Sequence, residues 1–413
     1  MNQFSLINKF LELKMDISDE TQNFLERHNF TLNIADNLHK KIIEDMKKGL
    51  KTGGSDQAMI KAGSAAVRKI KEGESAIVID AGGTNFRSCI VTKTKDGIEI
   101  SDFQKTVMPA IDRELNKKQF YQAIAQNISR LKDRSNKISF CFSYAMAITE
   151  DGDGKIIRFS KEVKVPEAVG TYLGKELLAE LKIQGWTKIK KINVLNDTTA
   201  LLLSSFVEKS EKNWGAHLAF ILGTGMNSAY IQNKRIIVTE CGMFSDLPQS
   251  DFDKTVCSRT TQPNQSLMEK MCSGAYLGDI ATEMVKTAVS EGFFSPSYAA
   301  PEHFDTKDFD KYFAKTEKEL SSDELKLKEL FYVIITRSAK LSAEAIYAAA
   351  FCSDKEKEEL PICITCNGST FWKTPLLKQT AEARLKDLLQ QPFEIIQIDD
   401  DITKGSFAAA FID

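Results

Sequence analysis

Two stretches of the chain share one pattern, in which an apolar run ends at a glycine-containing turn and a second apolar run follows. In the first stretch, residues 76–79 are apolar and two glycines stand at 82–83. In the second, the apolar residues 218–222 run into Gly-Thr-Gly at 223–225. Short apolar runs bounded by glycine are typical of buried strands joined by a turn. The pattern therefore predicts two strand–turn–strand units.

The segments after the two turns are predicted to fold in the same order. After the first turn we expect strands at 86–94, 98–107, 137–144 and 191–196, with helices at 116–134 and 171–184. After the second we expect strands at 227–232, 235–240, 361–366 and 393–399, with helices between them and at 372–390 and 402–411. An internal repeat of this kind predicts an α/β fold of two related lobes with a cleft between them.

The remaining segments are predicted to be mainly helical. In residues 1–54, apolar side chains recur every four residues from Ile34 to Leu50, and Gly53 ends the run, which indicates a packing helix. The other expectations are a polar lead-in at 61–74, a helix at 198–207, an exposed helical insertion at 291–330 and an apolar helix at 325–351.

A chain of 413 residues is long enough for two domains. We expect residues 1–74 to form helices that pack on the larger lobe. Residues 75–196 are expected to form the smaller lobe and residues 197–400 the larger one. The final helix, in residues 401–413, is expected to return to the smaller lobe.

Composition and charge narrow the possible partners. An apolar fraction of 42% and a charged fraction of 27% are those of an ordinary soluble protein, and a net charge of −2 gives no electrostatic basis for binding nucleic acid or an anionic membrane surface. The apolar runs are too short to span a bilayer, and the N-terminus lacks the apolar core of a signal peptide. We therefore expect no nucleic acid and no membrane as partners.

The eight cysteines lie mostly in apolar stretches, which favours free buried thiols and a cytoplasmic location. Cys363 and Cys366 form a C-x-x-C pair, but they fall in a predicted strand, where positions three apart point to opposite faces. We therefore expect neither a redox pair nor a zinc site there.

The first turn has the composition of a phosphate-binding loop. Glycines let backbone N–H groups approach an anion closely, and Thr84 and Asn85 add side-chain donors. Asp80 ends the preceding strand, where it can hold the water shell of a metal ion. A plain hairpin turn, which also favours glycine, is the alternative.

Several polar residues follow predicted strands. Asp197 stands at a strand-to-helix junction, where it can act as a helix cap or as a base for a substrate hydroxyl. Glu240 and Glu269 are either site residues or ordinary surface charges, and Lys161 next to Ser160 is by default a surface lysine. The turn at 367–370 suits a nucleoside or simply a helix N-terminus. No Walker-type loop, no Rossmann fingerprint and no spaced histidine pair is present.

Taken together, these motifs resemble the hexokinase family, within the superfamily of sugar kinases, Hsp70 and actin. The matching positions are 80–87, 140–143, 159–161, 196–198, 223–227, 240–244 and 268–279. Their order and spacing hold from residue 80 to residue 411. The chain departs from the family at Tyr144-Ala145, where a proline is usual, at Phe159 and Cys241, where tryptophans are usual, at Ser160 for threonine and in the stretch 262–264.

The resemblance implies lobes of the ribonuclease H-like (actin/Hsp70/hexokinase) type and phosphoryl transfer from ATP with Mg²⁺ to a hexose hydroxyl, the 6-hydroxyl of glucose or a related sugar. It implies Asp197 as the general base, with Arg87 or Lys161 meeting the charge on the phosphoryl group and Asp80 reaching the metal through water. The implied sugar-binding residues are Ser143, Ser160, Lys161, Asn196, Asp197, Asn227, Glu240 and Glu269. The implied nucleotide-binding residues are Asp80, Gly82, Gly83, Thr84, Asn85, Gly223, Thr224, Gly225, Gly368 and Ser369.

Two alternatives stay open. The departures from the family touch the walls of the sugar site, which favours considering a kinase for mannose, fructose or an N-acetylhexosamine. A non-catalytic sugar sensor on the same fold is the other alternative, because a fold does not fix a function. The oligomeric state is not predicted.

Overall fold

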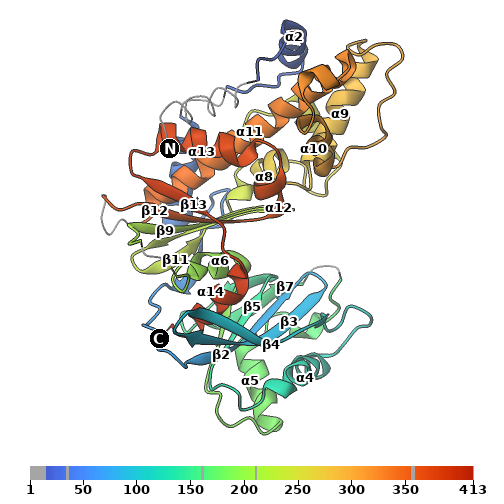
Figure 1. Ribbon diagram of the computed structural model, residues 1–413. Helices are drawn as coiled ribbons and strands as arrows, with labels where there is room; N and C mark the ends of the chain where they lie inside the picture. The colour runs from blue at the N-terminus through green and yellow to red at the C-terminus, as the bar shows by residue number, and fades with distance from the viewer. Residues whose placement is uncertain (1–14, 34–36, 160–161, 210–211, 355–358, 413) are drawn as a thin grey trace.

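The protein consists of two lobes, each built on one main β-sheet (Figure 1). The structure, a computed structural model, describes residues 15–33, 37–159, 162–209, 212–354 and 359–412. The sheet of the smaller lobe has the strand order β4-β3-β2-β5-β8, and that of the larger lobe has the order β1-β11-β10-β9-β12-β13.

The strands of the smaller lobe are β2 (Ser75–Gly82), β3 (Asn85–Thr94), β4 (Gly97–Val107), β5 (Ile138–Phe142) and β8 (Ile192–Leu195). Those of the larger lobe are β1 (Ile60–Ser64), β9 (Ala216–Leu222), β10 (Met226–Gln232), β11 (Arg235–Val238), β12 (Ile362–Asn367) and β13 (Phe393–Ile396). The helices of the smaller lobe are α4 (Lys117–Asn127) and α5 (Leu173–Ile183).

The two sheets repeat one topology, which confirms the predicted repeat. In the smaller lobe β2 pairs antiparallel with β3 and parallel with β5, and in the larger lobe β9 pairs antiparallel with β10 and parallel with β12. The strands β9, β10, β11, β12 and β13 thus take the places of β2, β3, β4, β5 and β8. The strand β1 is added at the β11 edge of the larger sheet.

Alternation along the central strands divides the interior into layers. In β2, Ile77 and Ile79 face the core of the smaller lobe, whereas Ala76 and Val78 face a second core. That second core also contains Ala219 of β9 and Ala229 of β10, so it lies between the two sheets. Because successive side chains of a strand point to opposite faces, one short run of apolar residues serves both cores.

Helices α6 (Asp197–Ser204) and α14 (Asp401–Ala409) fill the space between the sheets, and α14 is visible there in Figure 1. Helix α6 follows the smaller lobe's β8 but packs on β9 and β10, and α14 follows the larger lobe's β13 but packs on β2. The two helices meet at Gly405, where a Cβ would lie 1.7 Å from the carbonyl oxygen of Ala200. Glycine at this position permits the close contact.

The domain boundaries expected from the sequence remain a prediction.

The large lobe is completed by helices. They are α2 (Asp19–Arg27), α3 (Leu38–Lys51), α7 (Asp251–Ser258), α8 (Leu267–Cys272), α9 (Leu277–Ser290), α10 (Asp310–Phe313), α11 (Ser322–Cys352), α12 (Ser369–Lys373) and α13 (Leu377–Leu388). Helix α3 packs on the long helix α11.

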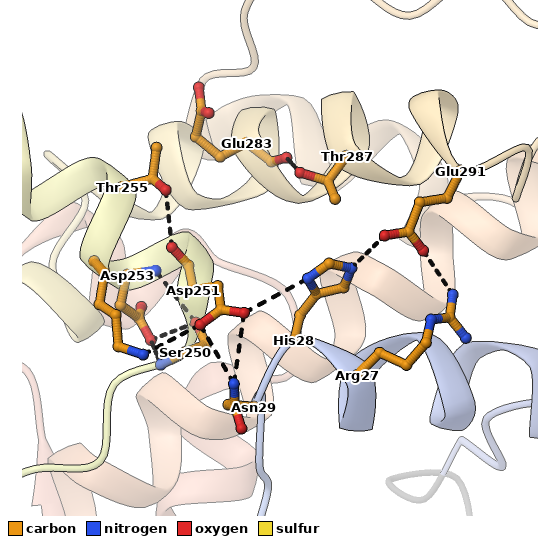
Figure 2. Close-up of polar contacts among 11 residues, drawn as sticks. Arg27, His28, Asn29, Ser250, Asp251, Asp253, Thr255, Glu283, Thr287 and Glu291 are labelled. Carbon is orange, nitrogen blue, oxygen red and sulfur yellow. Dashed lines mark hydrogen bonds and ion pairs between the residues drawn. The ribbon is translucent and has the colours of Figure 1, made fainter.

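The end of α2 is tied to α7 and α9 by polar contacts (Figure 2). His28 Nε2 lies 2.7 Å from Glu291 Oε1, and Arg27 Nη2 donates to Glu291 Oε2 at 2.7 Å. Asn29 Nδ2 donates to Asp251 Oδ1 at 3.3 Å. These contacts hold α2 on the face of the larger lobe away from the smaller one (Figure 1).

Several elements differ from the prediction. The strand β1, which pairs with β11, extends into the segment 61–74, where only a polar lead-in was expected. A hairpin of β6 (Ala145–Ile148) and β7 (Gly154–Arg158) lies in a stretch for which no strand was predicted. Pro375 lies between α12 and α13, and because proline cannot donate to a helix ladder, the helix expected at 372–390 is divided there. Residues 306–319, which were expected to be helical, hold only short turns of helix.

The helix expected at 116–134 is α4 followed by the short 3₁₀ turn η1 (Ser129–Leu131). The described part of residues 1–54 holds the helices α2 and α3, and residues 1–14 and 34–36 lie outside it. Within the described residues, every helix is too short or too polar to cross a membrane.

Candidate functional site

A cavity of about 450 Å³ lies between the lobes and collects the polar residues that were predicted at several strand ends. Ser143 follows β5, Asn196 and Asp197 join β8 to α6, Asn227 lies in β10, and Glu240 follows β11. The lining also contains apolar residues, namely Ala58, Ile60, Ala62, Met146, Ile148, Ile157, Val238 and Met243. The cavity therefore combines hydrogen-bonding groups with apolar surface.

Asp197 is held at the first turn of α6 without serving as its cap. The side chain of Asn196 caps the helix by accepting a hydrogen bond from the Thr199 N–H at 2.8 Å. Asp197 Oδ1 accepts from the Thr198 N–H at 2.7 Å. Burial raises the pKa of the Asp197 carboxyl and the charge of Asp80 raises it further, whereas the Thr198 hydrogen bonds oppose the shift. Asn196, not Asp197, is therefore the helix cap, and Asp197 lines the cavity.

Asn227 and Glu240 fix one another across the cavity wall. Asn227 Nδ2 donates to Glu240 Oε1 at 2.7 Å, and the Glu240 N–H donates to Asn227 Oδ1 at 3.0 Å. Glu240 has a φ of 56°, a left-handed conformation that is strained for a glutamate and that this reciprocal pair helps to hold. Burial raises the pKa of Glu240, and the neighbouring charges of Asp197 and Glu269 add to that shift.

Glu269 is not part of the lining of this cavity but contacts the second glycine turn. Its Oε2 accepts from the Met226 N–H at 3.0 Å, and a Cβ on Gly225 would lie 2.8 Å from the same oxygen. Burial raises the pKa of Glu269. Glu269 therefore contacts the second glycine turn directly.

The first glycine turn joins β2 to β3 and contacts Ser143 and Tyr144, which line the same cavity. Gly83 has a φ of 57°, and a Cβ on Gly82 would lie 3.0 Å from the Cβ of Ser143. Asp80 and Arg87 are opposite one another in the two strands, and Arg87 Nη1 donates to Asp80 Oδ2 at 2.6 Å. Burial raises the pKa of Asp80, and Arg87 opposes that shift. The residue predicted to hold a metal's water and the cation predicted to meet a phosphoryl group thus form one ion pair.

A second cavity, of about 280 Å³, lies on the other side of the second glycine turn. It brings together Thr224 and Ser369, which the sequence predicted, with Thr370 and Lys373. A Cβ on Gly368 would lie 2.1 Å from the carbonyl oxygen of Leu222. The turn at 367–370 therefore packs directly on the backbone of the second glycine turn. Gly368 has a φ of 112°, which also favours glycine.

Sequence reasoning missed part of this second cavity. Thr306, Lys307 and Asp310 line it, although they belong to the segment that was expected to be only an exposed insertion. Nothing in the local pattern of that charged segment separates these three residues from their neighbours. Ser160 and Lys161, which were predicted to bind the sugar, lie outside the described residues.

The two cavities have different chemistry. The second one offers several hydroxyls, the two lysines Lys307 and Lys373 and one carboxylate, Asp310, and its hydroxyls and lysines suit an anionic nucleotide. Within the described residues, no three His, Cys, Asp or Glu side chains converge as a metal cage. Mg²⁺ usually binds through one or two carboxylates, substrate phosphates and water, so the single carboxylate of Asp80 fits such an ion.

The two-lobed fold and the polar cavity between the lobes can be compared with those of known proteins. Two family models, both described as Hexokinase, match residues 20–207 and 217–412. The chain belongs to the hexokinase family, and this confirms both the resemblance and the predicted fold class.

Three relatives illustrate the relationship. Hexokinase-5 of Oryza sativa subsp. japonica is 24% identical over 411 residues, which cover 84% of this chain and 79% of the relative. Hexokinase-2 of Equus caballus is 22% identical over 429 residues, covering 92% of this chain but only 46% of the relative. The structure of the hexokinase from Schistosoma mansoni complexed with glucose superposes with a TM-score of 0.70 at 19% identity, covering 95% of this chain and 99% of that one. The last likeness establishes the fold.

Proposed function

We propose that this hexose kinase phosphorylates the 6-hydroxyl of glucose or a closely related hexose with ATP. The observation that carries the proposal is the cavity between the lobes, where Ser143, Asn196, Asp197, Asn227 and Glu240 converge. A sugar presents a ring of hydroxyls, each both donor and acceptor, and this mixture of amides, carboxylates and a hydroxyl matches it.

Asp197 is proposed as the base that accepts the proton of the attacking hydroxyl. It stands in the cavity lining, and its Oδ1 is oriented by Thr198. Phosphoryl transfer has a loose transition state, so a base of this kind mainly orients the nucleophile. Asn196, Asn227 and Glu240 are proposed to hold the other sugar hydroxyls, with Ser143 from the smaller lobe and Glu269 supporting the second glycine turn.

ATP is proposed to bind along the glycine turns, with its nucleoside in the second cavity near Thr224 and Ser369. The backbone N–H groups of residues 82–85 and 223–225 would meet the phosphates, and Asp80 would hold Mg²⁺ through water. When bound, the metal neutralises phosphate charge. Arg87 is proposed to meet charge on the transferred group, together with Lys161.

The direct test is a coupled assay for ADP formation with MgATP and a panel of glucose, mannose, fructose and N-acetylglucosamine. We expect turnover that depends on the sugar, with the largest kcat/KM for glucose. Sugar binding without turnover for any member of the panel would favour the sensor alternative. A cytoplasmic location remains a prediction.

One observation favours a second candidate, a kinase for an N-acetylhexosamine. The side chains of Met146, Ile148 and Ile157 give the cavity lining apolar surface, where an acetyl methyl group can pack. A higher kcat/KM for N-acetylglucosamine than for glucose would establish this candidate in place of the first.

A further inference from the structure

Tyr144 connects the sugar cavity to the first glycine turn. Its side chain lines the cavity next to Ser143, and its hydroxyl donates to the carbonyl oxygen of Gly83 at 2.7 Å. The ring is held by Phe142, with centroids 4.6 Å apart, and by Phe159, with centroids 5.6 Å apart. Only 8% of the residue is exposed, so the hydroxyl is aimed by packing.

The carbonyl that Tyr144 contacts belongs to the central peptide of the turn. Gly82 and Asn85 are paired in the ladder, so Gly83 and Thr84 are the two turn residues. A flip of this one peptide would change ψ of Gly83 and φ of Thr84; Gly83, at φ 57°, tolerates the change, but Thr84 would be driven to a positive φ that a β-branched residue resists. The hydrogen bond from Tyr144 adds to this preference for the observed orientation.

The orientation matters because the peptide is planar. The Gly83 carbonyl and the Thr84 N–H belong to the same rigid unit and point in opposite directions. While the carbonyl faces Tyr144, the Thr84 N–H must face away from the tyrosine. Two further bonds support the turn, from the Ser143 N–H to the Ala81 oxygen and from the Met108 N–H to the Thr84 oxygen, both at 2.9 Å, but neither involves the central peptide.

We propose that Tyr144 is a positioning residue that aims the Thr84 N–H at a nucleotide phosphate from within the wall of the sugar cavity. The inference rests on the proposed function, in which the first turn binds phosphate. Burial raises the pKa of Tyr144 to about 12, so the phenol keeps its proton under assay conditions. The residue touches the sugar side of the site but acts on the nucleotide side.

The test compares the wild-type chain with Tyr144→Phe, which removes only the hydroxyl. Isothermal titration with the non-hydrolysable analogue adenylyl imidodiphosphate and Mg²⁺ measures nucleotide affinity, and a glucose titration measures sugar affinity. We expect the analogue to bind about three- to tenfold more weakly, the usual effect of one lost hydrogen bond, and glucose to bind within about twofold of wild type. In the kinase assay, KM for ATP should rise while KM for glucose is retained.

The matched control is Tyr121→Phe, because the Tyr121 hydroxyl bonds to Thr171 Oγ1 at 2.9 Å in the same lobe but does not contact the turn. It should change neither affinity. Equal analogue binding by the Tyr144 and Tyr121 variants, or a parallel loss of glucose and analogue binding in Tyr144→Phe, would overturn the proposal. A wild-type chain that binds the analogue but phosphorylates no sugar would refute the proposed function, while the titrations would still decide on Tyr144. A wild-type chain that does not bind the analogue would overturn both.

Discussion

Among single residues, Asp197 is the one whose surroundings most directly suit chemistry. Its helix is capped by Asn196, so the carboxylate is not needed to begin α6. It is instead held in the lining of a cavity by hydrogen bonds from Thr198. Its raised pKa shows that its surroundings disfavour the ionised carboxylate. A half-buried carboxylate with a raised pKa and no capping role is a candidate for an active-site residue.

Replacing Asp197 with asparagine is expected to lower kcat at least about a hundredfold, the usual scale for a lost general base. The amide keeps the shape and can still accept from Thr198, so glucose should bind almost as in wild type. Steady-state kinetics together with glucose titration measure both quantities. The control is Asp151→Asn, a carboxylate in the turn between β6 and β7, which should leave kcat unchanged. Near-normal turnover in Asp197→Asn would exclude Asp197 as the base.

The pH dependence of kcat/KM should report the same carboxylate. The base must be ionised to accept a proton, and burial together with Asp80 raises its pKa above the ordinary aspartate value. Activity should therefore fall on the acid side at a pH above about 4, where an exposed aspartate titrates. In Asp80→Asn the inflection should move to lower pH, because a neighbouring negative charge is removed and Arg87 is released. An inflection that moves upward, or that lies at the ordinary value in wild type, would contradict this assignment.

The sequence revealed the site residues that follow strands, because an apolar run that ends in a polar residue is a local pattern. Asp197 and Glu240 are of this kind. It did not reveal that Glu269 contacts the second glycine turn, or that Thr306 and Lys307 line the second cavity. Those placements depend on how distant segments pack, and no local periodicity encodes them.

Among elements, the strands of both sheets were predicted well and the additions to them were not. The strands β2 and β9 are long, apolar and bounded by glycine, so their pattern is strong. The strand β1 has an exposed Lys61 and a glycine at 63, and its stability comes from pairing with β11. The hairpin β6–β7 likewise has alternating exposure over very few residues, which is a weak signal outside its tertiary context.

The contact between α6 and α14 is the element-level feature that most directly supports the site, since α6 carries Asp197. Gly405→Ala would place a methyl group 1.7 Å from the Ala200 carbonyl and force the helices apart. We expect a loss of about 1–3 kcal/mol in the free energy of unfolding, the usual cost of overpacking, and a larger fall in kcat than in glucose affinity. Denaturant unfolding and kinetics check both.

Thr403→Ala, on the same helix but only half-buried, is the matched control for Gly405→Ala and should change the unfolding free energy by about 0.5 kcal/mol or less. A Gly405→Ala chain with the wild-type free energy of unfolding would mean that α6 and α14 can move apart without a loss of stability.

For the whole molecule, the division of the polar groups between the lobes predicts a closing motion. Ser143 follows β5 of the smaller lobe, whereas Asn227 lies in β10 and Glu240 follows β11 of the larger lobe. A single hexose must bind both sets to satisfy its hydroxyls, and the cavity of about 450 Å³ is roomy for one sugar. Binding should therefore draw the lobes together about the α6–α14 contact and exclude water from the transferred phosphoryl group.

Small-angle X-ray scattering should show this closure as a smaller radius of gyration when glucose is added at saturating concentration. Glu240→Gln removes a charge from the cavity lining but keeps an oxygen to accept from Asn227, so it should need more glucose to reach the same compact state. In Gly405→Ala the helices that act as the pivot are displaced, so the radius should start from a different value and change less with the sugar. An unchanged radius in the wild-type chain, at a glucose concentration that titration shows to be saturating, would mean that the cavity holds its ligand from one lobe alone and that water exclusion must come from another part of the protein.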